Sequence, residues 1–160
     1  MLKIRLSVVV TGVLCLVVGQ VRGQESADTL AVQWLQFQEG VARAQKADKP
    51  IFLMVGAPWC GPCARLKSET YPDPLVARAM RAFVPVELTI DDWDRKQRIG
   101  PYRLTEAAWS ERLGAAETPT LLVLTSDLQV LGRHTGFLPP EGLLPILNAA
   151  ARAASNHDDS

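Results

Sequence analysis

Residues 51–63 read Ile-Phe-Leu-Met-Val-Gly-Ala-Pro-Trp-Cys-Gly-Pro-Cys. The first five form a continuous apolar run of strand length, which is typical of a central strand buried on both faces. Ala57, Pro58 and Trp59 then lead into Cys60, where we expect a helix to begin and to continue to about residue 68. The stretch therefore predicts a buried strand followed by a helix whose first turn carries two cysteines.

The position of Cys60 and Cys63 at a helix start has a chemical consequence. A helix N-terminus presents unpaired N–H groups and a partial positive charge, and both favour a thiolate over a thiol. In motifs with two spacer residues the cysteine pKa falls below its free value of about 8.5. Cys60, at the exposed helix end, is predicted to be the nucleophile. Cys63, one turn further in and more shielded, is predicted to resolve the mixed disulfide.

Other uses of the two cysteines have less support. A zinc site needs a second pair of ligands. His134 and His157 are the only histidines, and the third cysteine, Cys15, lies in a segment that we expect to be removed. A structural disulfide between residues three apart closes a small loop and restrains little. We therefore expect no metal and no cofactor beyond the cysteine pair itself.

Residues 1–23 have the pattern of a secretory signal peptide. Lys3 and Arg5 form a basic start, residues 6–18 are almost wholly apolar, and small residues follow up to Gly23. The apolar run is 13 residues long, whereas a membrane-spanning helix needs about 20. We expect cleavage after Gly23, a mature domain over residues 24–160 that is periplasmic or secreted, and no stable membrane insertion.

The composition of the chain limits the number of domains and the kind of partner to be expected. The chain has 160 residues, which predicts one domain, and 48% of them are hydrophobic, as in an ordinary globular protein. Basic and acidic residues number 17 each, and removal of residues 1–23 takes away three basic residues and no acid. Without a basic excess, nucleic acid is not an expected partner.

Apolar and polar patterning predicts an α/β fold. Strands are expected over residues 31–34, 51–55, 84–90, 120–125 and 129–133. Helices are expected over residues 36–47, 60–68, 74–83, 105–113 and 140–154. The alternating first half predicts parallel strands, the last two strands a hairpin, and the helices a cover for both faces. Residues 91–104 are expected to form a loop with at most a turn of helix, and residues 155–160 a frayed polar tail.

The motif at residues 59–63, Trp-Cys-Gly-Pro-Cys, matches the active site of the thioredoxin superfamily, which the chain resembles over about residues 30–152. Thr118-Pro119-Thr120 resembles the second signature of that family, in which the proline is cis. The resemblance implies a three-layer α/β/α fold with a central mixed sheet of four to five strands. It also implies substrate contacts, made by Trp59, Gly61, Pro62, Thr118 and Pro119.

Residues 34–63 and the later Tyr71-Pro72-Asp73-Pro74 resemble one subgroup more closely. That subgroup contains the C-terminal domain of the bacterial transmembrane disulfide reductase and small exported thioredoxin-like proteins. One departure from the superfamily stands out. Typical thioredoxins carry a buried Asp six residues before the first cysteine, where this chain has Met54, and a partner Lys where it has Glu87. Two interpretations of Glu87 stay open: a proton relay for Cys63, or a solvated strand residue.

The resemblance implies thiol–disulfide exchange on protein or small disulfide substrates. The Gly61-Pro62 spacer is the one found in reducing thioredoxins, which favours reduction. A secretory compartment lacks the cytosolic reductants, so the implied partner is a membrane-embedded electron donor. The alternatives are a disulfide oxidase or isomerase with the same residues, since direction follows the reduction potential, and a non-catalytic binding or chaperone module. Trp93 and Tyr102 mark the 91–104 segment either as a partner-binding insertion or as a loop anchored to the body.

Overall fold

The computed structural model describes residues 31–157. The predicted signal peptide and its cleavage site fall within residues 1–30, outside the described part of the chain, so they stay predictions.

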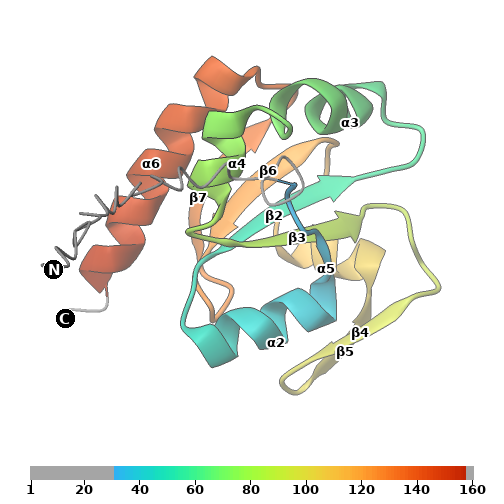
Figure 1. The fold of residues 1–160 in the computed structure, drawn as a ribbon. Coiled ribbons are helices and arrows are strands. Elements are labelled where there is room, and N and C mark those ends of the chain that lie inside the picture. The colour runs from blue at the N-terminus through green and yellow to red at the C-terminus, as the bar shows by residue number, and fades with distance from the viewer. Residues whose placement is uncertain (1–30, 158–160) are drawn as a thin grey trace, which may run out of the picture.

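A five-stranded mixed sheet forms the centre of the fold (Figure 1). Its strands are β1 (Leu35–Gln36), β2 (Ile51–Gly56), β3 (Val84–Thr89), β6 (Thr120–Leu124) and β7 (Val130–Thr135). They lie in the order β1-β3-β2-β6-β7, with β1, β3 and β2 parallel and with β6 and β7 antiparallel to their neighbours. All six residues of β2 are buried, as the apolar run predicts for a central strand.

Helices cover both faces of this sheet (Figure 1). On one face lie α2 (Phe37–Ala47) and α5 (Glu106–Arg112), which pack with Leu53 and Val86. On the other lie α3 (Gly61–Arg65), the π-helix η1 (Leu66–Thr70), α4 (Pro74–Met80) and α6 (Pro140–His157), which pack with Phe52 and Met54. The alternating side chains of β2 therefore divide the core in two, and the three-layer α/β/α architecture with a mixed sheet is confirmed.

The prediction of a loop over residues 91–104 is wrong. This segment contains a hairpin, β4 (Lys96–Ile99) and β5 (Tyr102–Thr105), which forms a separate two-stranded sheet. Gly100, at a φ of +54°, and Pro101 make the turn. Charged side chains on the outer face hide the alternation from sequence analysis, because only Gln97 and Ile99 of β4 are buried.

Several element boundaries also differ from the prediction, and three of them are instructive. The first strand lies at Leu35–Gln36 and not at 31–34. Leu35 and Gln36 pair with Val86 and Glu87 of β3. The helix predicted over residues 60–68 widens into the π-helix at Leu66. The predicted polar tail is partly helical, because α6 runs to His157 through an alanine-rich stretch of high helix propensity.

Candidate active site

A tight turn and a helix start together position Cys60. Beyond β2, the N–H of Cys60 donates to the carbonyl of Ala57 at 3.1 Å, closing a turn that contains Pro58. Cys60 is then the N-cap of α3, and its Sγ accepts a hydrogen bond from the N–H of Cys63 at 3.1 Å. Pro62 lies in the first turn, where a missing N–H costs nothing because that donor would be unpaired in any case. The sulfur of Cys60 thus satisfies a helix-end donor.

Cys60 and Cys63 are joined as a disulfide, with their Cα atoms 5.2 Å apart. In this oxidised form Cys60 and Cys63 are almost equally buried, at 5% and 4% exposed, so the predicted difference in exposure between the two cysteines stays a prediction for the reduced protein. The neighbouring residues Trp59, Gly61 and Pro62 are exposed, whereas both cysteines are buried. What distinguishes the sulfurs is their hydrogen bonding: the helix-end N–H contacts Cys60, and a side-chain hydroxyl contacts Cys63.

That hydroxyl belongs to Thr118. Its Oγ1 lies 3.2 Å from Sγ of Cys63 and 3.3 Å from the carbonyl oxygen of Val55. A disulfide sulfur and a carbonyl oxygen carry no proton, so both can only accept, and they compete for the single hydroxyl proton of Thr118. The Thr118–Pro119 peptide bond is cis, as the resemblance implies. The loop before β6 is thereby brought to the disulfide, while its role in substrate binding stays a prediction.

The strand beneath Cys63 is closely packed and apolar. A Cβ added at Gly56 would lie 3.3 Å from Sγ of Cys63 and 3.5 Å from Cε of Met54. Gly56 therefore lets α3 approach β2, and the methyl group of Met54 lies close to the position that such a Cβ would occupy. The position where typical thioredoxins have an Asp is occupied here by a 3% exposed thioether.

Glu87 lies on the expected face but is not the deeply buried carboxyl that the relay hypothesis assumed. The register pairs Met54 with Glu87 across β2 and β3, so their side chains share a face. Glu87 Oε1 lies 2.8 Å from Nζ of Lys67, and its side chain is 28% exposed. The relay role stays a prediction, for a carboxylate that already has a cationic partner.

Next to this ion pair, Tyr71 is a polar group that sequence analysis did not single out. Its hydroxyl is buried and has no hydrogen-bond partner within residues 31–157. Burial, and to a lesser extent the Glu87 carboxylate, raise the pKa of Tyr71 above its ordinary value. The phenol therefore stays neutral, and its ring packs against Trp34 at 4.8 Å between centroids.

Trp59 is fixed by a residue that sequence analysis did not connect with the site. Its side chain is 67% exposed, and its indole Nε1 donates to Oδ2 of Asp91 at 2.7 Å. Asp91 follows β3 closely, so the loop that leads to the hairpin also orients the aromatic side chain beside the disulfide. No local pattern in the sequence links two residues 32 positions apart.

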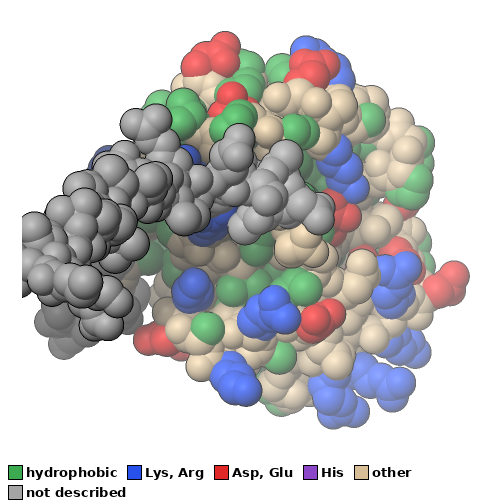
Figure 2. All heavy atoms as spheres, in the orientation of Figure 1, with side chains coloured by type: hydrophobic (Ala, Val, Ile, Leu, Met, Phe, Trp, Pro, Cys, Tyr) green, Lys and Arg blue, Asp and Glu red, His purple; other side chains and the backbone are tan. Residues whose placement is uncertain are grey.

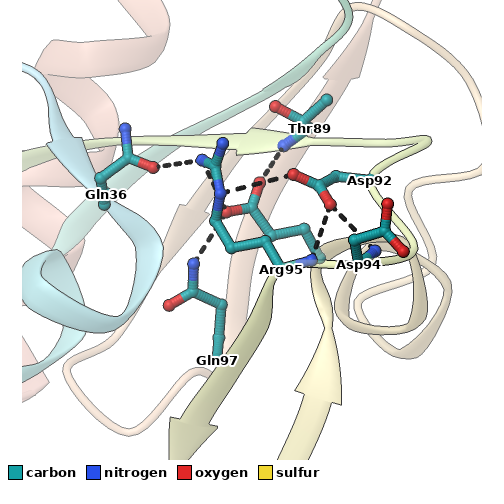
Figure 3. Close-up of polar contacts among 7 residues, drawn as sticks. Gln36, Thr89, Asp92, Asp94, Arg95 and Gln97 are labelled. Atoms are coloured by element: carbon teal, nitrogen blue, oxygen red, sulfur yellow. Dashed lines mark hydrogen bonds and ion pairs between the residues drawn. The ribbon is translucent and has the colours of Figure 1, made fainter.

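Sequence analysis also missed a buried carboxylate, Glu106, which is 1% exposed. Its three hydrogen-bond donors, Thr89, Arg95 and Gln97, are labelled in Figure 3. Its Oε2 accepts the N–H of Thr89 at 2.7 Å, and its Oε1 accepts Nε2 of Gln97 at 2.8 Å and Nη1 of Arg95 at 3.3 Å. These donors come from the end of β3 and from the hairpin, so one carboxylate joins both to α5. Its place in the first turn of a helix is the one available signal, and that signal says nothing of burial.

Two further features bear on the expectations. Within residues 31–157, no group of three or more His, Cys, Asp or Glu side chains is arranged to hold a metal ion. In the same part of the chain, every helix is too short or too polar to cross a membrane.

Comparison with known proteins agrees with this geometry. Residues 37–151 match the family described as a thioredoxin-like domain. A thioredoxin from Thermus thermophilus is 22% identical, with a TM-score of 0.61, over 74% of this chain and 86% of its own. A proposed disulphide isomerase from Bacteroides thetaiotaomicron is 28% identical, with a TM-score of 0.58, over 75% of this chain and 91% of its own.

The structure of the DsbH oxidoreductase is also similar, at 15% identity and a TM-score of 0.58, over 76% of this chain and 85% of its own. Among curated proteins no match was found. Thioredoxin-like domains act through their cysteine pair without a cofactor. With a Cys-x-x-Cys pair at disulfide distance at the start of α3, the chain belongs to the thioredoxin-like domain family.

Proposed function

We propose that this protein is a thiol–disulfide oxidoreductase that reduces disulfides of protein or small-molecule substrates outside the cytoplasm. The observation that carries the proposal is the Cys60–Cys63 disulfide at the start of α3, beside exposed residues and in contact with Thr118 of the Thr118–Pro119 loop. The extracytoplasmic location rests on the signal-like pattern of residues 1–23.

In the reduced protein, the Cys60 thiolate attacks one sulfur of a substrate disulfide. A mixed disulfide forms and the other substrate sulfur leaves as a thiolate, which takes a proton from water. Cys63, as its thiolate, then attacks Sγ of Cys60, and the second substrate sulfur leaves and is protonated in turn. The substrate gains two electrons and two protons, and the protein is left with the Cys60–Cys63 disulfide of this structure.

The two sulfurs have different hydrogen-bond partners, which suit different roles in the reaction. The N–H of Cys63 points at Sγ of Cys60 and stabilises negative charge there, which suits a nucleophile. The Thr118 hydroxyl lies 3.2 Å from Sγ of Cys63 and 3.3 Å from the carbonyl oxygen of Val55, so it can turn its proton from that carbonyl to the Cys63 thiolate that leaves when the disulfide is reduced again. The two electrons for that step come from a dithiol donor. We propose a membrane-embedded donor, on the resemblance to the subgroup of exported thioredoxin-like proteins.

Two cysteine variants test this assignment. Cys63→Ser is expected to trap a mixed disulfide between Cys60 and a disulfide substrate, because the resolving sulfur is gone, whereas Cys60→Ser traps none. Intact-mass analysis after mixing with an oxidised peptide measures both. Reduction of insulin by the wild-type protein with dithiothreitol tests turnover. Trapping by Cys60→Ser instead of Cys63→Ser would reverse the roles, and no reduction of insulin or of a small disulfide would reject the activity.

The similarity to a proposed disulphide isomerase favours one alternative, which is isomerisation or oxidation through the same cysteines. Direction depends on the reduction potential of the Cys60–Cys63 couple relative to its compartment. A potential near that of thioredoxin, about −270 mV, supports a reductase, while a value near −120 mV supports an oxidase. Equilibration with glutathione buffers measures this quantity directly.

A further inference from the structure

The hairpin of β4 and β5 presents one face to the body of the protein and one to solvent. The antiparallel register pairs Lys96 with Thr105, Arg98 with Arg103, and Ile99 with Tyr102. Because side chains alternate along a strand, Lys96, Arg98 and Arg103 lie on the same face. All three are exposed, and we call this surface the basic hairpin face. Figure 2 shows Lys and Arg side chains gathered at the lower right, where Figure 1 places the hairpin.

The inner face of the hairpin is held firmly in place. Ile99 and Leu104 pack into the core that contains Trp109, whose Nε1 donates to the carbonyl of Gln97 at 3.2 Å. The amide of Gln97 donates to the buried Glu106 carboxylate at 2.8 Å. The basic hairpin face is therefore presented in a fixed orientation, rather than on a loosely attached loop.

The cations of this face are not neutralised within the described part of the chain. Arg98 and Arg103 lie directly opposite each other, an arrangement that destabilises a sheet when the charges are alike. Within residues 31–157, Lys96, Arg98 and Arg103 have no ion-pair partner. The nearby Asp91 and Asp92 are engaged with the indole of Trp59 and with Arg95.

The hairpin is also close in sequence to the disulfide site. Asp91, which binds Trp59, lies seven residues before Arg98. An extended chain covers at most about 3.6 Å per residue, so the two positions are at most roughly 25 Å apart. A partner that contacts the basic hairpin face can therefore place a disulfide at Cys60 through a short linking segment.

We propose that the basic hairpin face docks a short acidic segment of the disulfide-bearing protein that this site reduces. This inference rests on the proposed function and adds a class of substrate to it. Charge complementarity selects an acidic occupant. A short protein segment fits better than a continuous polyanion, because the exposed Asp91, which binds Trp59, and the exposed Asp94 precede the hairpin in the chain and repel a uniformly charged strand.

Two peptides and two variants test the proposal. Each peptide carries one disulfide, an eight-residue Gly/Ser spacer and a tail of either four Glu or four Gln. Arg98→Gln with Arg103→Gln removes two charges from the face, and removal of a like-charge pair does not threaten the fold. Arg78→Gln with Arg152→Gln removes two charges from exposed positions on α4 and α6, as the matched control.

At low ionic strength, the KM of the wild-type protein for the Glu-tailed peptide is expected to be about fivefold lower than for the Gln-tailed peptide, the effect of two exposed ion pairs. The preference falls below about twofold in the hairpin variant and in high salt, and it persists in the control variant. Equal KM values in the wild-type protein, or a preference that survives in the hairpin variant, would overturn the inference. Binding of duplex DNA or anionic vesicles without any peptide preference would also overturn it. Failure to reduce either peptide would instead reject the proposed function.

Discussion

The two sides of the central sheet differ in how deeply a carboxylate is buried. Under α3, the position next to the resolving cysteine is occupied by Met54, and the carboxylate on that face, Glu87, is paired with Lys67 and partly exposed. On the α5 side, Glu106 in the first turn of that helix is almost fully buried and accepts three hydrogen bonds. Within residues 31–157 the deeply buried carboxylate therefore holds the hairpin in place, whereas the position near the resolving cysteine carries the apolar side chain of Met54.

Glu106→Ala is expected to give the largest effect on stability. The change leaves the N–H of Thr89 and the amide of Gln97 without their buried acceptor, and it removes the partner of Arg95. We expect the free energy of unfolding to fall by about 3 kcal/mol, measured by urea denaturation. Glu111→Ala, at an exposed position of the same helix, is the control and changes stability little. A loss below about 1 kcal/mol would contradict the architectural role of the buried carboxylate.

Thr118→Val tests the other side of the comparison. It keeps the shape of the side chain and removes the hydroxyl that contacts Cys63, so the Cys63 thiolate becomes a poorer leaving group. We expect reduction of the Cys60–Cys63 disulfide by dithiothreitol to slow about tenfold, as one charge-assisted hydrogen bond allows, measured by stopped-flow tryptophan fluorescence. Thr118→Ser restores the hydroxyl and most of the rate. If the Ser variant were as slow as the Val variant, side-chain shape and not the hydroxyl would be responsible.

Sequence analysis succeeded where the deciding residues are neighbours along the chain. The apolar run of β2, the Cys60–Cys63 spacing and the cis Thr118–Pro119 bond all follow from short stretches, and all are confirmed. It failed where burial depends on distant segments. The donors to Glu106 come from positions 89, 95 and 97, and nothing local marks that carboxylate as buried.

The hairpin was missed for a related reason. Its charged outer residues dominate the composition, while its buried face consists of alternate residues contributed by two strands. The Gly100-Pro101 pair was the available signal for the turn. The burial of Cys60 at the helix start also depends on surrounding segments, which an argument from position in the helix does not include.

Glu87→Gln tests whether the half-buried carboxylate takes any part in proton transfer to Cys63. If it does, the change slows exchange by about threefold and flattens the pH dependence of the rate between about pH 5 and pH 9. Lys67→Gln is the control, because it breaks the same 2.8 Å ion pair and keeps the carboxylate. A relay predicts different pH profiles for the two variants. Identical profiles would leave Glu87 as one half of a surface ion pair, worth about 0.2–1 kcal/mol.

Asp92→Asn probes the loop between β3 and β4 and should have the smallest effect on stability. The N–H groups of Arg95 and Asp94 donate to the Asp92 carboxylate at 2.8 and 3.1 Å, and the bond from Arg95 is the main cause that holds the pKa of Asp92 below its ordinary value. A carboxyl whose pKa is lower in the folded than in the unfolded state stabilises the fold above the unfolded value, about 3.9. That stabilisation is lost as the pH falls through the lower, folded value.

The wild-type protein is therefore expected to be slightly more stable than Asp92→Asn at neutral pH, and the difference should vanish in acid. Thermal unfolding between about pH 2 and pH 7 measures it, with Asp127→Asn in the exposed turn before β7 as the control. A difference that stayed constant down to the acid limit would show that the amide disturbs the loop itself, and that the charge of Asp92 contributes nothing to holding the hairpin beside Trp59.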